Sequence, residues 1–199
     1  MNRRDFILTA LAGLTLPGIT LAGLAPAHAA RPGDVVFRLG APDWITHAIT
    51  THSPLPEGDR RWTHAGVVVS GGDDPLVVHA MPDAGVHLVR LSDFRAPIAA
   101  RDFALLQIRD PALGQRFGRA AARRLGLPFD HRLRLSSDSS MYCTELVVKA
   151  LADVGVALQV PAIRVAFYSE RIVHPDSLFQ SLIRADEFKP ADLNSIPGR

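Results

Sequence analysis

The order of the apolar segments constrains the fold of this chain more than any other feature. Segments with the alternating or β-branched pattern of strands come first, at residues 31–39, 62–69, 76–80, 85–91 and 103–108. The turn residues 71–74 predict that the second and third of these segments form a hairpin. Helical patterns flank and follow them, at residues 42–50, 111–125, 143–154 and 177–184. Strands that precede helices in this order predict an α+β fold.

Length and charge narrow the class of protein. A chain of 199 residues is long enough for a single domain with a full core. Its hydrophobic content of 47% and charged content of 21% are ordinary for globular proteins. The net charge is +2 and the basic residues are dispersed, so nothing indicates nucleic acid as a partner. These features leave the oligomeric state open.

The N-terminus has the pattern of an export signal. Arg3 and Arg4 precede an apolar stretch that runs from Ile7 to Leu24, and the small-residue pattern Ala27-His28-Ala29 follows it. This arrangement predicts a signal peptide over residues 1–29 that is cleaved before Ala30. The paired arginines resemble the twin-arginine (Tat) signal, which implies export by the Tat machinery to the periplasm of a bacterium. The alternative is an uncleaved membrane anchor, because the apolar run is almost long enough to span a bilayer.

Cys143 is the only cysteine of the chain, and it opens an amphipathic helix. Ser139 or Ser140 is expected to cap this helix, and Glu145 places a negative charge in its first turn. A thiol at a helix N-terminus faces unpaired backbone N–H groups, which favour the thiolate and lower the pKa to roughly 3.5–7.5 when a base or cation is near. The sequence therefore predicts a nucleophilic cysteine. The alternative is an inert cysteine on the apolar face of the helix.

Histidine is the natural base for such a thiol. His64 stands where a loop becomes a strand, next to two small residues, and His79 lies near the end of the adjacent strand, where the hairpin can bring the two rings together. His64 is thus the predicted base, and His79 is predicted to orient it as the third member of a triad does. A metal site at His47 and His52, or at His64 and His79, is a weaker alternative, because no recognised ligand spacing is present. No metal or other cofactor is expected.

Four motifs resemble, in their order, those of the circularly permuted NlpC-type papain-like hydrolases, and in particular the YiiX/YebB/YaeF-like cysteine amidases: Gly33 to Phe37, Thr63 to Val68, Leu125 to Asp130 and Tyr142 to Val147. The resemblance implies an antiparallel sheet or half-barrel packed against the nucleophile helix. It assigns Cys143 as nucleophile, His64 as base and His79 as the residue that orients the base. The chain departs from the YiiX-like pattern at His79, where that group has an acidic residue and other NlpC-type enzymes have histidine. The predicted hydrolase domain spans residues 30–188, and residues 189–199 are predicted to form a loose tail.

The resemblance also implies acyl transfer to sulfur through a thioester. The oxyanion is expected to be held by backbone N–H groups at the start of the cysteine helix, including that of Cys143, with Tyr142 as a further donor. Asp34 and Asp130 are expected to brace turns or loops rather than to take part in catalysis.

The exported compartment favours a peptide substrate, such as the stem peptide of peptidoglycan. Two alternatives stay open at this point. One is a lipid or acyl-ester hydrolase or acyltransferase with the same site, and the other is a binding protein without catalysis. Specificity is expected to lie in the loops of residues 41–61 and 159–176, which carry no recognisable motif.

Overall fold

The structure is a computed structural model that describes residues 30–40, 44–96, 102–166 and 168–191. The predicted signal peptide, residues 1–29, lies outside the described residues, and so does most of the predicted tail. None of the helices in the described ranges has the length and apolar character that a membrane span needs.

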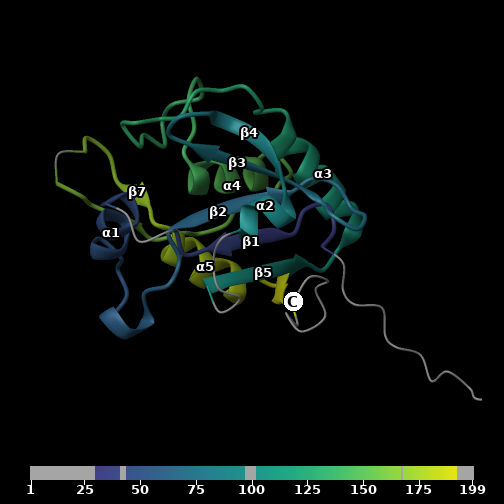
Figure 1. Ribbon diagram of the computed structural model, residues 1–199, viewed down its shortest axis with the longest axis horizontal. Coiled ribbons are helices and arrows are strands. Elements are labelled where there is room, and N and C mark those ends of the chain that lie inside the picture. Colours follow the sequence, from purple (N-terminus) through teal and green to yellow (C-terminus); the bar gives the residue numbers. More distant parts are fainter. Residues whose placement is uncertain (1–29, 41–43, 97–101, 167, 192–199) are drawn as a thin grey trace, which may run out of the picture.

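An antiparallel sheet of six strands forms the centre of the fold (Figure 1). Its strands lie in the order β4-β3-β2-β1-β5-β8, so β1 to β4 form a meander, and β5 and β8 add to it beside β1. The bounds are β1 Val35–Arg38, β2 His64–Val68, β3 Leu76–Met81, β4 Gly85–Arg90, β5 Phe103–Ile108 and β8 Phe188–Pro190. The first five correspond to the segments predicted from periodicity, and the predicted α+β class is confirmed.

Five α-helices occur among the described residues: α1 Trp44–Thr51, α2 Leu91–Arg95, α3 Pro111–Ala122, α4 Cys143–Ala152 and α5 Pro175–Arg184. Four of them correspond to the predicted helical segments. The five-residue helix α2 was not predicted, because Leu91 continues the alternating pattern of β4. Both Leu91 and Phe94 of this helix are buried.

The two faces of the sheet carry different helices. On one face, Val35 and Phe37 of β1 and Ala65 and Val67 of β2 belong to a core shared with α3, α4 and α5. On the other face, the alternate residues of the same strands pack with Phe94 of α2. This division follows from the two-residue period of a strand, which turns successive side chains to opposite faces. The cysteine helix α4 packs on β2 and β3, as Figure 1 shows.

Two parts of the C-terminal region differ from the prediction. The tail predicted to be loose from residue 189 begins within the sheet, because Lys189 and Pro190 belong to β8 and pair with Gln107 and Leu106 of β5. The region between α4 and α5, predicted as loop, contains the two-residue strands β6 Ala162–Ile163 and β7 Ile172–Val173. Strands this short carry no measurable alternation, so their pairing depends on the tertiary fold.

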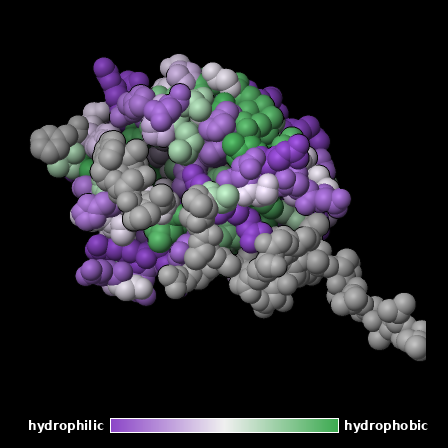
Figure 2. Space-filling view, in the orientation of Figure 1, coloured by the Kyte–Doolittle hydropathy of each residue, from purple (hydrophilic) through white to green (hydrophobic). Residues whose placement is uncertain are grey.

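Most of the surface in the view of Figure 2 is hydrophilic, with a hydrophobic area at its upper right. The large hydrophobic side chains most exposed among the described residues are Leu88 of β4 and Leu125, which follows α3. The segments that carry them are neighbours, because the N–H of Val86 donates to the carbonyl of Leu127. Isolated apolar side chains of this kind are common on soluble domains.

Candidate active site

Cys143 is the first residue of α4, and its side chain is partly exposed. The N-cap residue is Tyr142, so the predicted caps Ser139 and Ser140 are wrong; the N-cap lies two or three residues beyond them. Glu145 caps the start of the helix, because its Oε2 accepts a hydrogen bond of 3.2 Å from the backbone N–H of the N-cap residue Tyr142. Lys149 lies 3.1 Å from the second oxygen of this buried carboxylate. The nucleophile thus stands on a helix start that is held from within the helix.

The thiol does not have the lowered pKa that its position predicts. Backbone N–H groups of Ala65, Thr144 and Cys143 itself point at the sulfur and lower its pKa, as expected at a helix N-terminus. Burial acts in the opposite direction and is the larger effect, so the pKa of Cys143 rises to about 11. The prediction of a thiolate is therefore wrong for this resting arrangement, in which Cys143 is a neutral thiol.

The two predicted histidines lie in direct contact. The Nε2 atom of His64 and the Nδ1 atom of His79 are 2.7 Å apart, and both side chains are buried, at 8% and 4% exposure. The ring of His64 also stacks on Phe94, with the centroids 5.6 Å apart. Burial, the charge of Arg38 and neighbouring histidines hold the pKa of His64 well below its usual value and lower that of His79 to about 3. Both imidazoles are therefore neutral at physiological pH.

The contact between the histidines uses Nε2 of His64, so Nδ1 is the ring nitrogen of His64 that is left to act as a base. Two neutral tautomers are compatible with it. When Nε2–H of His64 donates to Nδ1 of His79, the lone pair of His64 lies on Nδ1, where it can accept a proton from a thiol. His79 then carries its own proton on Nε2, an atom that is buried without a hydrogen-bond partner among the described residues. This tautomer makes His64 the base and His79 the acceptor that orients it.

The sulfur of Cys143 lies against the backbone that follows His64. The sulfur faces the N–H of Ala65, which belongs to the peptide bond between His64 and Ala65. Within the described ranges no hydrogen bond joins the sulfur of Cys143 to the imidazole of His64. Catalytic hydrogen bonds commonly shorten only when substrate is bound. The arrangement thus places a neutral thiol next to a neutral base, which suits removal of the thiol proton during attack rather than before it.

Arg38 is a charged residue of the site that the sequence analysis missed. It pairs with His64 across β1 and β2, its Nη1 donates to the carbonyl of Phe94 at 3.1 Å, and its guanidinium lies 5.0 Å from the centre of the Phe94 ring. Its Nε is buried and has no hydrogen-bond partner in the described part of the chain. Its charge lowers the pKa of Cys143, His64 and His79. No motif pointed to Arg38, because only strand pairing brings it beside His64.

Replacing Arg38 with Gln is expected to move the pH dependence of Cys143 alkylation to higher pH. The positive charge favours the thiolate, so its loss raises the pKa of the thiol, by up to about one unit for a charge several ångströms away. Arg38→Lys keeps the charge and should leave the midpoint close to that of the wild type. Iodoacetamide alkylation rates measured by mass spectrometry up to pH 12, beyond the pKa of about 11 of the thiol, test this. A midpoint that is the same in all three proteins would show that Arg38 has no electrostatic effect on Cys143.

Three further predicted residues, Tyr142, Asp34 and Asp130, have defined roles in the fold. The Tyr142 hydroxyl accepts a hydrogen bond of 3.2 Å from the N–H of Val173, so it links the start of α4 to β7. The buried carboxylate of Asp34 accepts from the N–H groups of Arg31 and Ile108 and ties the first turn to β5. Asp130 accepts from two backbone N–H groups of its own loop, those of residues 132 and 134. Both aspartates thus hold backbone segments in place.

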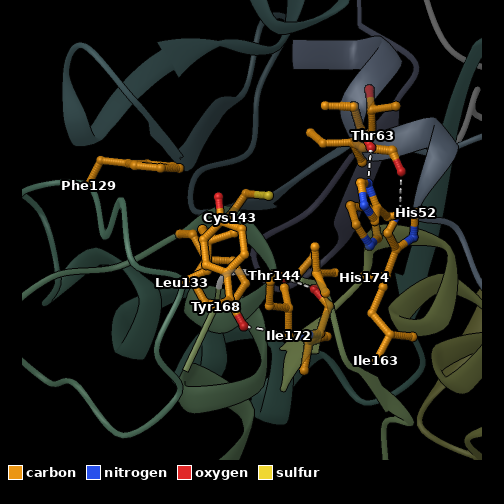
Figure 3. A pocket seen from close by; sticks show the side chains of 16 residues that line it. His52, Thr63, Phe129, Leu133, Cys143, Thr144, Ile163, Tyr168, Ile172 and His174 are labelled. Atoms are coloured by element: carbon orange, nitrogen blue, oxygen red, sulfur yellow. Dashed lines mark hydrogen bonds between the residues drawn. The ribbon is translucent and has the colours of Figure 1, made fainter. Parts of the chain in front are cut away.

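A pocket of about 190 Å³ opens beside Cys143. Figure 3 shows Cys143 between Phe129 on one side and Thr63 and His52 on the other. Apart from the residues at the start of α4, most of the lining comes from the two loop regions in which specificity was expected: Ala48, Ile49 and His52 from the first, and Ile163, Val165, Tyr168, Ile172, Val173, His174 and Pro175 from the second. The lining is predominantly aliphatic and aromatic.

The remaining histidines do not join the site as metal ligands. His174 caps α5 by accepting from the N–H of Asp176, and its Nε2 lies 2.9 Å from the carbonyl of Ile49. His52 lies 2.7 Å from the carbonyl of Ala48 within the region of α1. The described residues contain no group of three or more His, Cys, Asp or Glu side chains arranged to hold a metal ion.

Comparison with known families agrees with this fold. The profile of the permuted papain-like amidases, YaeF/YiiX, family C92, matches residues 29–185. The chain belongs to the C92 family. The resemblance inferred from the four sequence motifs is thereby confirmed, and the family consists of papain-like cysteine amidases or peptidases.

Among solved structures, the C92 chain is similar to that of yiiX from Escherichia coli O157:H7, which is described as a metalloprotein. The TM-score is 0.63 at 19% identity, and the similarity covers 80% of this chain and 95% of yiiX. At this identity the similarity supports the fold. The search of curated proteins found no match.

Replacing His79 with Ala is expected to lower turnover about 10- to 100-fold, less than the loss of the base itself. A group that orients a base acts through that base, so its removal leaves the proton transfer possible but less well placed. The matched control is His87→Ala, because His87 packs 4.3 Å from the His79 ring. The kcat and KM of both variants measure the effect. Equal activity of His79→Ala and the wild type would leave His79 with a structural role only.

Proposed function

We propose that this C92 chain is an exported cysteine amidase that carries the acyl group of its substrate as a thioester on Cys143. One observation supports this most strongly. The single cysteine of the chain stands at the first turn of α4, faces three backbone N–H groups and forms part of the wall of a pocket. A structural cysteine needs neither the N–H groups nor the pocket.

In the proposed reaction, the sulfur of Cys143 attacks the substrate carbonyl while Nδ1 of His64 takes the thiol proton. The tetrahedral intermediate collapses to the thioester, and the imidazolium returns the proton to the departing nitrogen or oxygen. Water, deprotonated by the same imidazole, then attacks the thioester and releases the acid and the free thiol. His79 holds the ring of His64 through its contact with Nε2.

The N–H groups at the start of α4 are suited to the oxyanion. Those of Cys143 and Thr144 already point at the sulfur, and a carbonyl under attack by that sulfur lies within their reach. We infer that they hold the developing negative charge. Tyr142 contributes by anchoring this helix start to β7, since its hydroxyl is engaged with the N–H of Val173.

No step of this reaction passes through a metal. The solved yiiX structure is described as that of a metalloprotein. In this chain the described residues offer no cluster of ligands that fits a metal ion. The two ring nitrogens that face one another, His64 Nε2 and His79 Nδ1, are 2.7 Å apart, a separation suited to a shared proton.

The scissile bond has two candidates. A peptide amide, such as that of a peptidoglycan stem peptide, agrees with the proposed export and with the amidase family. An ester or amide of a lipid uses the same site, and the apolar lining of the pocket beside Cys143 favours it. Both candidates require acyl transfer to Cys143.

The test offers muropeptides and acyl lipids side by side to the purified protein and identifies the products by mass spectrometry. A covalent adduct on Cys143 whose mass equals that of the acyl group, and which hydroxylamine removes, is the expected result. Release of neither product, together with the absence of any adduct, would favour a binding protein over an enzyme.

Export is tested separately. With Arg3 and Arg4 both changed to Lys, the chain is expected to stay in the cytoplasm of a bacterial host, whereas the unchanged chain reaches the periplasm. Cell fractionation with immunoblotting distinguishes the two, and the size of the exported form shows whether the segment before Ala30 has been removed. Equal export of both forms would exclude the Tat pathway.

A further inference from the structure

We propose that Arg38 binds a carboxylate on the leaving amine of the substrate, so that the enzyme prefers amides of amino acids whose α-carboxylate is free. The inference rests on the proposed function, because it takes Cys143 as the nucleophile and His64 as the group that protonates the departing nitrogen. It goes further in naming the leaving group and the residue that selects it. Neither Arg38 nor His64 belongs to the lining of the pocket beside Cys143, so this anion site is separate from that pocket.

Arg38 lies beside the base of the proposed reaction. It is the last residue of β1, and it stands directly opposite His64, the first residue of β2, in an antiparallel pair. Side chains at opposite positions of neighbouring strands leave the sheet on the same face, with their Cβ atoms about 4.5–5.5 Å apart. Both side chains also contact the ring of Phe94, whose centre lies 5.0 Å from the guanidinium carbon and 5.6 Å from the centre of the imidazole. Arg38 and His64 are therefore neighbours on one face of the sheet.

The direction of proton transfer determines which part of the substrate reaches Arg38. In the proposed reaction His64 gives its proton to the leaving nitrogen, so this nitrogen lies within hydrogen-bond distance of the ring, roughly 2.6–3.2 Å. In an amino acid a single carbon separates the nitrogen from the carboxylate. A leaving nitrogen held at His64 thus brings its carboxylate close to the neighbouring Arg38.

Most hydrogen-bond donors of Arg38 are free to bind a ligand. Within the described part of the chain, its guanidinium makes one hydrogen bond, from Nη1 to the carbonyl of Phe94. Its Nε is buried without a partner, although the side chain as a whole is partly exposed. A guanidinium offers its N–H groups as a planar fork that matches the two oxygens of a carboxylate. A bound carboxylate would also end the cost of the unmade hydrogen bond at Nε.

The positive charge of Arg38 has no counter-ion inside the protein. No Asp or Glu of the described residues forms an ion pair or a hydrogen bond with it. Burial lowers the pKa of Arg38, and the sulfur of Cys143, rather than a carboxylate, is the group that acts in the opposite direction. A partly desolvated cation without a partner is unfavourable, so a substrate anion that supplies the partner gains affinity.

The first experiment compares N-hexanoylalanine with N-hexanoylalaninamide, which differ in the charge at the end of the leaving group. In the wild type, kcat/KM for release of hexanoic acid should be at least about tenfold higher for the carboxylate, the size of a hydrogen bond to a charged group. In Arg38→Gln this ratio should fall to about one, and any effect of the variant on Cys143 itself cancels in the ratio. Equal rates in the wild type, or a ratio that Arg38→Gln leaves unchanged, would overturn the inference.

Two further variants separate a bound carboxylate from attraction by charge alone. Arg38→Lys keeps the charge without the planar fork, so its ratio should lie between those of the wild type and Arg38→Gln; the full ratio would contradict the paired hydrogen bonds. Arg95→Gln is the matched control, because Arg95 lies over the ring of Phe103 and does not act on the pKa of Cys143. A ratio that falls equally in Arg95→Gln would assign the preference to the general charge of the protein.

A third substrate tests the side on which the anion binds. N-succinylalaninamide carries its carboxylate on the acyl group instead of the amine. Its kcat/KM relative to that of N-hexanoylalaninamide should be the same in Arg38→Gln and the wild type. A relative rate that falls in Arg38→Gln for this compound, and not for N-hexanoylalanine, would place the anion site on the acyl side and contradict the proposal.

A readout without turnover separates this inference from the proposed function. N-iodoacetylglycine should alkylate Cys143 at least about tenfold faster than N-iodoacetylglycinamide, after correction for their rates with 2-mercaptoethanol, and Arg38→Gln should remove the difference. This preference in a protein that cleaves neither amide supports the Arg38 site and contradicts the hydrolase. Cleavage without a preference in either experiment supports the hydrolase and contradicts the Arg38 site.

Discussion

Cys143→Ala is expected to abolish turnover and to leave the protein folded. Without the sulfur no thioester forms, and removal of a nucleophile of this kind commonly lowers kcat by about 10⁴-fold or more. Product release under saturating substrate, measured against the wild type at equal concentration, tests the loss. Activity within tenfold of the wild type would exclude the thiol mechanism.

The fold should tolerate this substitution for a local reason. Cys143 is partly exposed, it begins α4, and alanine is the best helix former. The main hydrogen bond at this helix start, from the N–H of Tyr142 to Glu145, does not use the sulfur. Thermal unfolding and circular dichroism should therefore match the wild type closely. Because the chain has one cysteine, a thiol titration that falls from one to zero verifies the variant.

His64→Gln is expected to lower turnover by about 10³-fold or more and to slow the alkylation of Cys143 near neutral pH. The physical reason is the pKa of the thiol, which burial raises to about 11. A thiol with that pKa is almost entirely protonated at pH 7, so its reaction depends on a base that takes the proton during attack. His64, whose pKa is lowered, is neutral there and can act as that base.

The pH profile distinguishes a lost base from a disturbed fold. In His64→Gln the alkylation rate should rise about tenfold per pH unit until it approaches the pKa of the thiol, whereas the wild type should react measurably at pH 7. His47→Ala is the matched control, because His47 is exposed on α1 and does not line the pocket. Identical profiles for His64→Gln and the wild type would show that another group deprotonates Cys143.

A comparison of Cys143→Ala with His64→Gln distinguishes the role of the nucleophile from that of the base. Loss of turnover in both, with slow alkylation in His64→Gln, is the pattern that a thiol and histidine pair requires. Loss of turnover in His64→Gln with unchanged alkylation would move His64 from the thiol to the leaving group or to the hydrolytic water. In either case His79 acts on the ring of His64, since it contacts that ring and not the sulfur.

Much of the sheet was predictable because its strands carry their own pattern. Alternation of two residues indicated β1 to β5, and the spacing of apolar residues after Cys143 indicated α4. The same local reasoning failed for α2 and for the strands β6, β7 and β8, which have two to five residues each. Segments this short take their structure from the neighbours against which they pack.

The residues of the site also divide into those that local sequence patterns predicted and those that they missed. The hairpin of β2 and β3 suggested that His64 and His79 would meet, because residues of adjacent strands lie close together. Arg38 was missed although it lies opposite His64, since β1 precedes β2 by more than twenty residues and their register cannot be read from either strand. The pocket was missed in part, because its walls come from two loop regions that strands β2 to β5 separate in sequence.

Local sequence patterns were thus sufficient for strands β1 to β5, the cysteine helix and the family, and they led to the prediction of Cys143 as nucleophile with His64 and His79 beside it. The protonation of the site was decided only by the tertiary structure. A helix N-terminus by itself favours a thiolate, but the packing of α4 against β2 shields Cys143 and His64 from much of the surrounding water. Desolvation raises the pKa of Cys143 more than the backbone N–H groups lower it, and it also lowers the pKa of His64, together with His79 and Arg38. The apolar lining of the pocket beside Cys143 has the same origin, because it arises where distant segments bring their side chains together.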